Sequence, residues 1–206
     1  EICKEFEKKD DRIKYIRQKK NMQALWNFNF VLKEAKYDYF VWAAADDLWG
    51  ETFLEKNMKY LENDEEYVGS ISNVIKYGEN LKNFESNEND NIIQKEYKKI
   101  RKYFRPFEIC PIIGNHHERI KKFLKNPSAL IIYGLFRTKY LKKSVSAKNF
   151  LAADFMIILN ILEYGNIVVL DEVLLEYYAG GSSSKGLIYQ FKNEQIPLID
   201  VILPYF

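Results

Sequence analysis

The sequence predicts an α/β fold, a mostly parallel twisted sheet with flanking helices. Two observations predict it. Helical and strand-like patterns alternate along the first 77 residues, as in parallel sheets built from crossover units. In addition, the apolar run YDYFVWAAADDLW ends abruptly in two adjacent carboxylates, Asp46 and Asp47. With 206 residues and 47% hydrophobic content, the chain can bury a substantial core, and we expect a single domain.

The first half of the chain contains helices and strands in turn. Apolar residues at helical spacing indicate helices at residues 1–11, 21–35 and 51–61. Alternating or continuous apolar residues indicate strands at residues 12–18, 39–44 and 67–77. The first helix reads as the end of one that begins before residue 1.

The second half follows a polar stretch at residues 78–100, whose Asn, Glu and Lys content predicts an exposed insertion. Beyond it, the patterns indicate helices at residues 116–125, 137–143 and 149–165. They indicate strands at residues 129–136, 166–170 and 173–178. The sequence GGSSSKG, residues 180–186, predicts a flexible loop, since it lacks the spacing of a phosphate-binding P-loop.

Charge and cysteine content exclude several classes of protein. The chain has 31 basic and 29 acidic residues, so no global field marks a nucleic-acid binder. Cys3 and Cys110 have no metal-ligand spacing, which leaves a reduced, cytoplasmic protein as the default. Its apolar stretches fall short of the ~20 residues of a transmembrane helix. The basic segment at residues 119–125 offers either peripheral membrane contact or an ordinary solvated face.

The adjacent carboxylates Asp46 and Asp47 are the first candidates for chemistry. A strand that ends in paired carboxylates places them in the crevice where open α/β sheets bind ligands. Mg²⁺ and Mn²⁺ prefer oxygen ligands, and Mg²⁺ typically takes one or two carboxylates together with substrate phosphates and water. The alternative is that the pair caps the loop or the next helix.

Asp154 is the second candidate, because an acid within the run FLAADFMIIL is costly to bury alone. It therefore caps a helix, pairs with a base or faces a polar cavity. Arg137, which follows the strand at residues 129–136, either reaches a phosphate or pairs with an acid. The sequence alone does not separate these alternatives.

A resemblance to family 2 glycosyltransferases of the GT-A fold, a Rossmann-like architecture, runs through residues 1–75. It is carried by RIKYIRQKKNMQALWNFNFVLKEAKYDYFVWAAADDLWGETFLEKNMKYLEND. The later segments YGLFRTKYL and AADFMIILNILEYGNIVVLDEVLLEYY resemble the acceptor half of the same family more loosely. By this resemblance, residues 1–77 form the half that binds nucleotide sugar and metal, and residues 101–206 form the acceptor half.

The resemblance implies a role for each candidate residue. Asp46 and Asp47 would bind Mn²⁺ or Mg²⁺ and, through it, the diphosphate of the donor. Asn21 falls where the family contacts the nucleotide, although helix capping is an equal alternative, and Asp154 falls where the family has its catalytic base. The implied reaction is the metal-dependent, inverting transfer of a sugar from a nucleotide-diphosphate sugar to an acceptor hydroxyl in glycan or polysaccharide synthesis. UDP-linked donors are the commonest choice.

Some positions depart from the family pattern. Gln23 stands where relatives often have glycine, Ala44 and Ala45 stand where an acid commonly precedes the pair, and AGGSSSKG lacks the histidine that many relatives place there. The family's first strand-helix-strand unit is also missing, which favours a fragment of a longer protein. These departures support an alternative function, a noncatalytic sugar-binding, nucleotide-binding or interaction module that keeps the fold.

Overall fold

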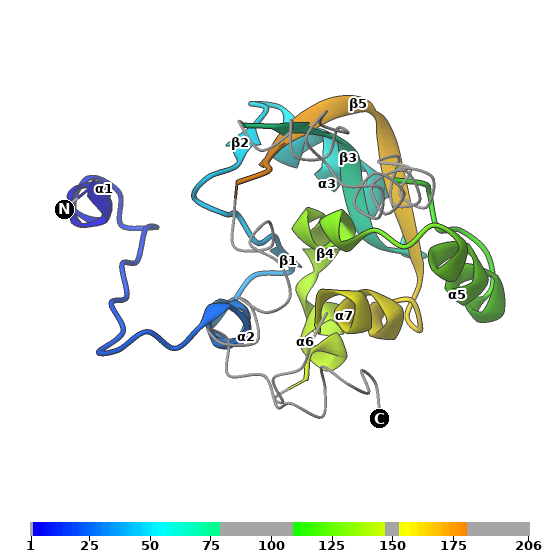
Figure 1. Cartoon of the computed structure of the whole chain (residues 1–206), viewed down its shortest axis with the longest axis horizontal. Helices are drawn as coiled ribbons and strands as arrows, with labels where there is room; N and C mark the ends of the chain where they lie inside the picture. Colours follow the sequence, from blue (N-terminus) through cyan, green and yellow to red (C-terminus); the bar gives the residue numbers. More distant parts are fainter. Residues whose placement is uncertain (1, 79–108, 147–152, 181–206) are drawn as a thin grey trace, which may run out of the picture.

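The computed structural model describes residues 2–78, 109–146 and 153–180, and it confirms the α/β class (Figure 1). The strands are β1 (Tyr39–Phe40), β2 (Leu48–Trp49), β3 (Tyr67–Tyr77), β4 (Leu135–Arg137) and β5 (Asn166–Tyr178). The helices are α1 (Ile2–Lys9), α2 (Ala24–Glu34), α3 (Phe53–Asn63), α5 (His116–Lys125), α6 (Thr138–Ser144), α7 (Ala153–Ile161) and the short 3₁₀ helix η2 (Ala129–Tyr133). Two predicted segments lie almost entirely outside the described residues. They are the insertion at residues 78–100, described only at residue 78, and the loop at residues 180–186, described only at residue 180.

The five strands form one curled sheet in the order β1-β4-β3-β5-β2 (Figure 1). β3 and β5 pair in parallel, whereas the other three neighbouring pairs are antiparallel. β1, β3 and β5 therefore share one direction, and β4 and β2 run against them. The strands that share a direction deliver their carboxyl ends to one edge, which is where sheets of this class bind ligands.

β5 contains an irregular stretch that changes its register with β3. Leu170 lies opposite Ser72, but the next paired residue of β5 is Val173, opposite Asn73, and a further shift follows before Val74. Asp171 and Glu172, which have no register partner in β3, are exposed. The sequence predicted two strands split at these residues, and the structure instead shows a single bulged strand.

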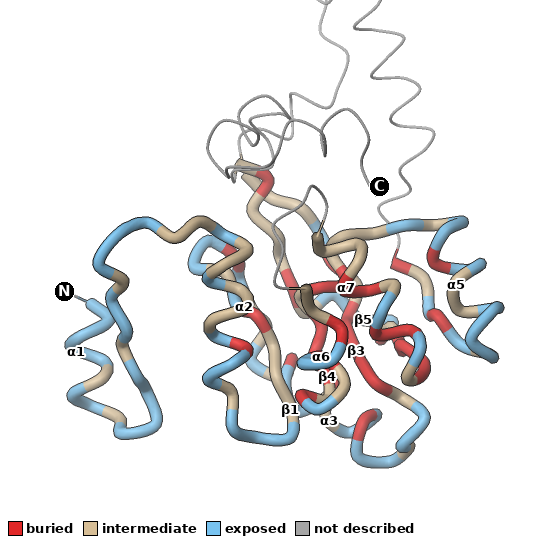
Figure 2. Tube along the Cα trace, turned by 90° about the horizontal axis from the view of Figure 1, so that it is seen from below, coloured by how far each residue is buried: buried red, intermediate tan, exposed pale blue. Residues whose placement is uncertain are grey.

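The core lies between the sheet and the helices that cover it. Buried residues concentrate in β3, β4, β5 and α7 (Figure 2). α7 is apolar around most of its circumference and buries Ile157, Ile158 and Ile161, as expected of a helix packed on several sides. Gly69 of β3 leaves room for the Phe136 ring, since a Cβ there would lie 2.5 Å from it.

The N-terminal arm, residues 2–23, differs from the body of the protein. α1 buries no residue and stands apart from the sheet, joined to α2 by an extended segment (Figures 1 and 2). The strand predicted at residues 12–18 is wrong, because a strand needs the hydrogen bonds of a neighbour and the described part of the chain supplies none there.

Other boundaries also differ from the predictions. The apolar run at residues 129–136 was expected to be one strand, but it forms η2 followed by β4. A short apolar run fits a buried helix as well as a strand, so periodicity alone does not separate them. The strand predicted at residues 39–44 narrows to β1, which pairs with the short β4. By contrast, β3 and α5 have the predicted bounds.

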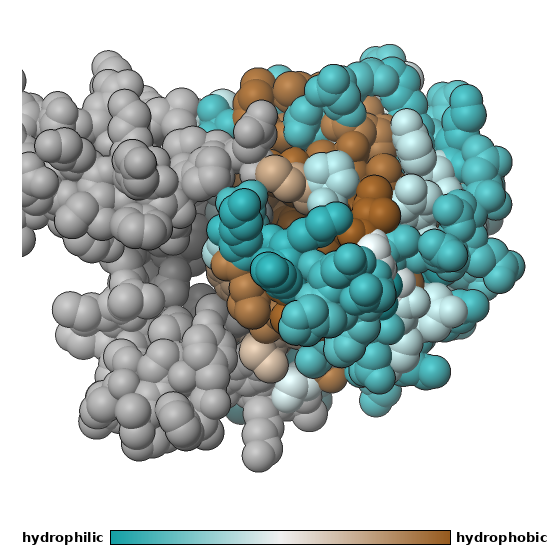
Figure 3. Space-filling view, turned by 90° about the vertical axis from the view of Figure 1, so that its right-hand side faces the viewer, coloured by the Kyte–Doolittle hydropathy of each residue, from teal (hydrophilic) through white to brown (hydrophobic). Residues whose placement is uncertain are grey.

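α5 begins at a capping box, in which the Asn115 side chain accepts from the Glu118 backbone and the Glu118 side chain accepts from the Asn115 backbone. The side of the molecule that carries α5 is covered mostly by polar and charged side chains (Figure 3). Within the described ranges, we find no helix that has both the length and the apolar character to cross a membrane.

Candidate functional site

The structure places Asp46 and Asp47 at the carboxyl ends of the parallel pair β3 and β5, whereas β1, the strand that was expected to lead directly into them, ends at Phe40. The Tyr178 backbone N–H donates to Asp47 Oδ1 over 2.9 Å. The Tyr77 hydroxyl donates to the Asp46 backbone carbonyl. Asp47 leads directly into β2, whose residue Leu48 pairs with Glu176 of β5. Both last residues of the parallel strands therefore hold the acidic loop in place.

Asp47 is an unusual carboxylate because it is buried and only partly paired. Asp47 is 8% exposed. Its Oδ2 atom is buried and has no hydrogen-bond partner among the residues that the structure describes. Burial raises the pKa of Asp47, the hydrogen bond from Tyr178 opposes that rise, and the charge of Asp46 adds to it. A buried carboxylate oxygen without a partner is costly unless a ligand supplies one.

Asp46 and Asp47 are the residues that could hold a divalent cation. Asp46 is exposed and Asp47 is the next residue in the chain, so the pair offers two carboxylates, which is the number that Mg²⁺ typically takes from protein. No group of three or more His, Cys, Asp or Glu side chains with metal-site geometry occurs in the described part of the chain. Substrate phosphates and water are the usual source of the other ligands.

Asp154 lies in the first turn of α7 and is half-buried. The Phe155 backbone N–H donates to its Oδ1 over 2.9 Å, so the carboxylate caps the exposed amides of the helix start. Burial nonetheless raises the pKa of Asp154, and the backbone hydrogen bonds of Phe155 and Asp154 itself only oppose that rise. The side chain thus combines a capping contact with the raised pKa that suits a general base.

Asn21 lies on the arm before α2 rather than within the helix. Its side-chain oxygen accepts from the Gln23 backbone N–H over 2.9 Å, which makes a local turn, and its side chain is exposed. Gln23 has a φ of 70° and a ψ of 169°, a conformation that is almost confined to glycine. Position 23, where relatives often have glycine, thus has a backbone conformation that favours glycine. The nucleotide contact of Asn21 stays a prediction.

Arg137 is held at the opposite end of β3 from the acids. Its guanidinium donates to three backbone carbonyls around the end of α3, those of Tyr67, Leu61 and Asp64. It also lies over the Tyr39 ring, 5.7 Å from the centroid. The structure does not bring Arg137 together with Asp46 and Asp47, and it gives the guanidinium structural partners, so its phosphate contact remains a prediction.

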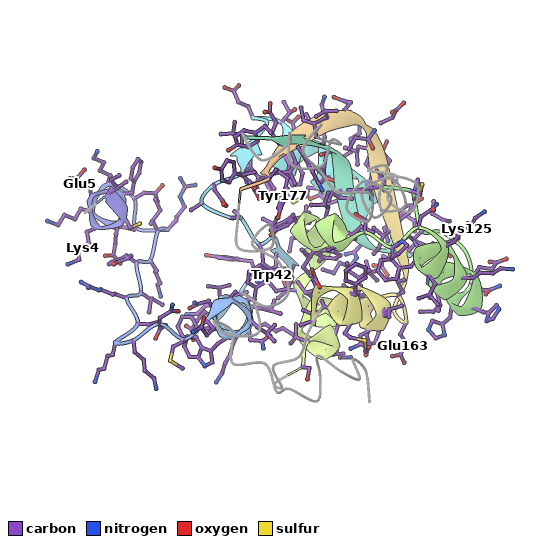
Figure 4. All side chains as sticks on the ribbon, viewed as in Figure 1. Lys4, Glu5, Trp42, Lys125, Glu163 and Tyr177 are labelled. Carbon is purple, nitrogen blue, oxygen red and sulfur yellow. The ribbon has the colours of Figure 1, made fainter. Side chains whose placement is uncertain are left out.

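A group of tyrosines surrounds the acids, and sequence reasoning missed it. The Tyr77 and Tyr178 rings lie 5.4 Å apart, and those of Tyr133 and Tyr177 lie 5.8 Å apart. Tyr177 lies near the carboxyl end of β5 (Figure 4). Trp42 is not part of this group, since it packs between α2 and the sheet and its Nε1 donates to the Phe28 carbonyl. The available signal was that both predicted strands, at residues 67–77 and 173–178, end in tyrosine.

The chain is similar to known glycosyltransferases. Residues 1–124 match the model of the family described as glycosyl transferase family 2. An uncharacterized glycosyltransferase of Methanocaldococcus jannaschii is 33% identical to this chain over 107 residues, which are 50% of this chain and 35% of that protein. The chain therefore matches about a third of that relative's length.

The fold is that of an α/β protein with an acidic loop at the carboxyl ends of its parallel strands, and the family match makes the class specific. This chain belongs to glycosyltransferase family 2.

Proposed function

We propose that this protein transfers a sugar from a nucleotide-diphosphate sugar to an acceptor hydroxyl, using Mn²⁺ or Mg²⁺ and inverting the anomeric carbon. The observation that carries the proposal is the buried, unpartnered Oδ2 of Asp47 at the carboxyl edge of β3 and β5, in a chain of family 2. A UDP-linked donor and a role in glycan or polysaccharide synthesis are the first choices within this class.

The chain's own residues divide the work. Asp46 and Asp47 would hold the cation, which when bound offsets charge on the departing diphosphate as a Lewis acid. Asp154 accepts the proton of the acceptor hydroxyl. The acceptor oxygen bonds to the anomeric carbon as the bond from that carbon to the diphosphate oxygen breaks, and the electron pair leaves with the nucleoside diphosphate. A single displacement without an enzyme nucleophile inverts the centre.

The raised pKa of Asp154 supports its role in this scheme. A base must be ionised to accept a proton, and its affinity for the proton rises with its pKa. Burial that raises the pKa of Asp154 above the ordinary aspartate value therefore strengthens it as a base.

The test is thermal unfolding of the protein with a panel of nucleotide sugars, with and without Mn²⁺. A donor at about 100 times its Kd stabilises the native state by ~2.7 kcal/mol, which is roughly 5–10 °C for a chain of this size. We expect this shift only when the metal is present. Asp47→Asn should abolish it, whereas Asp38→Asn, which neutralises an exposed aspartate beside β1, should retain it.

Two results contradict the proposal. One is the absence of a shift with every donor in the presence of metal. The other is an equal shift with EDTA or in Asp47→Asn, which would favour the noncatalytic binding module instead.

A further inference from the structure

Tyr133 is a residue that the proposed reaction has not yet used. It is the last residue of η2, separated from β4 by Gly134 alone, and its side chain is half-buried. Its ring packs at a tilt of 43° against Tyr177, which follows Glu176 of β5 and precedes Tyr178. Tyr178 is the residue whose backbone N–H holds Asp47. One ring contact thus joins Tyr133 to the strand end that fixes the acidic loop.

The element that carries Tyr133 packs against the elements that carry or hold the three candidate carboxylates. η2 packs against α7, which carries Asp154 in its first turn, and the Tyr133 ring packs against Tyr177, the residue before Tyr178, which holds Asp47. Burial raises the pKa of Tyr133, and the charges of Tyr177, Asp47, Asp154 and Asp46 raise it further. Its phenol stays protonated near neutral pH and can both donate and accept a hydrogen bond.

This position has a defined place in a single displacement. The leaving diphosphate lies on the side of Asp46 and Asp47, and the attacking acceptor oxygen lies on the side of Asp154. The transferred sugar must bridge these two sides, because its anomeric carbon exchanges one oxygen for the other. Tyr133 belongs to an element packed against α7, and its ring contacts the strand end that holds Asp47, so we place it in the region that the sugar ring crosses.

We propose that the Tyr133 hydroxyl hydrogen-bonds a hydroxyl of the transferred sugar, beside the Tyr177 ring, and so contributes to selection of the donor sugar. This inference rests on the proposed function. By this inference, η2 contacts the sugar of the donor rather than its nucleotide.

The chain offers a matched control. Tyr140 is also a half-buried tyrosine packed on a second tyrosine, with its ring 5.1 Å from that of Tyr164. It lies on α6, and no interaction that we find in the described residues links it to the three acids. Tyr133→Phe and Tyr140→Phe therefore each delete one hydroxyl and keep one packed ring.

The experiment compares calorimetric Kd values in Mn²⁺ for UDP, GDP and dTDP with those for UDP-glucose, UDP-N-acetylglucosamine, GDP-mannose and dTDP-rhamnose. For the best-bound donor, Tyr133→Phe should weaken nucleotide-sugar binding roughly 3- to 10-fold, the worth of one hydrogen bond. It should leave nucleoside-diphosphate binding within about twofold, which also shows that the variant is folded. Tyr140→Phe should leave both affinities unchanged.

The outcomes separate the two proposals. If Tyr133→Phe binds nucleotide sugar and nucleoside diphosphate as wild type does, or loses both equally, the sugar contact is wrong while the proposed function stands. If wild type binds no nucleoside diphosphate in a metal-dependent way, the proposed function is wrong, and the Tyr133 assignment falls with it.

Discussion

The charged side chains at the two ends of β3 differ in how completely their polar atoms are hydrogen-bonded. At the end near Tyr67, the Arg137 guanidinium donates to backbone carbonyls at the close of α3. At the end near Tyr77, Asp47 accepts one backbone hydrogen bond and leaves Oδ2 buried and unpartnered. Both residues looked like ligand contacts in the sequence.

The difference teaches how to weigh a charged residue in a fold of this kind. A charged side chain whose hydrogen-bonding capacity is used by the backbone stabilises the structure, because removing it would leave carbonyls unpaired. A buried charge with spare capacity costs stability unless a ligand completes it. We therefore expect the Arg137 end to be structural and the acidic end to bind ligand.

The largest expected effect concerns catalysis at the acidic end. Asp154→Asn removes the base and should lower kcat by about 10²–10⁴-fold, while donor binding measured by calorimetry stays within about twofold. In wild type, kcat should fall as the pH is lowered through the raised pKa of Asp154, because the protonated carboxyl cannot accept the acceptor's proton. Unchanged kcat in Asp154→Asn would exclude the base role and leave the capping contact with Phe155 as its function.

The next effect concerns stability at the other end of β3. Arg137→Met should lower the free energy of unfolding by about 3 kcal/mol, since it leaves carbonyls at the end of α3 without their donor. Chemical denaturation measures the change. Arg12→Met is the control, because Arg12 pairs with Asp10 at the surface, where water and salt screen the attraction and the pair adds little to stability. A small loss in Arg137→Met, together with weaker donor binding, would instead support the predicted phosphate contact.

The smallest effect has the opposite sign. Asp47→Asn in metal-free buffer should raise the free energy of unfolding by up to about 1 kcal/mol at pH 7, because it removes a buried charge while an amide oxygen can still accept from Tyr178. Since the folded pKa of Asp47 lies above its unfolded value, the native state binds the proton more tightly. Stability from this group is therefore lost as the pH rises through that interval.

The difference between wild type and Asp47→Asn should consequently shrink as the pH is lowered below the raised pKa of Asp47. Denaturation curves at several pH values, with EDTA throughout, measure this trend. A variant that is less stable than wild type without metal at pH 7 would show that the carboxylate has a structural partner and would weaken the contrast between the two ends of β3.

Local pattern predicted the elements that are long or well delimited. β3 is eleven residues long and α5 is flanked by its caps, and both have the expected bounds. The apolar run that ends in Asp46 and Asp47 drew attention to these residues, but the strands at whose ends they lie are β3 and β5 rather than their own. The family resemblance was confirmed by the match over residues 1–124.

The remaining features depend on partners that are distant in the sequence. The partners of Arg137 include Leu61, which is 76 residues away, and no local pattern identifies a carbonyl at the end of another helix. η2 could not be separated from a strand, because ALIIY is too short to have a distinctive period. Tyr133 could not be singled out either, because its ring contact is with Tyr177, which is distant in the sequence.

The bulge in β5 decides which residue reaches the acidic loop. From Ser72 to Tyr77, β3 advances five residues while β5 advances eight, from Leu170 to Tyr178. Without the three extra residues, the register would place Leu175 opposite Tyr77, and the Tyr178 N–H would no longer stand at Asp47. The shape of this edge therefore depends on the bulge rather than on the identity of its residues, because a change that straightened β5 without shortening it would move Tyr178 away from Asp47 while every residue named at the site remained in the chain.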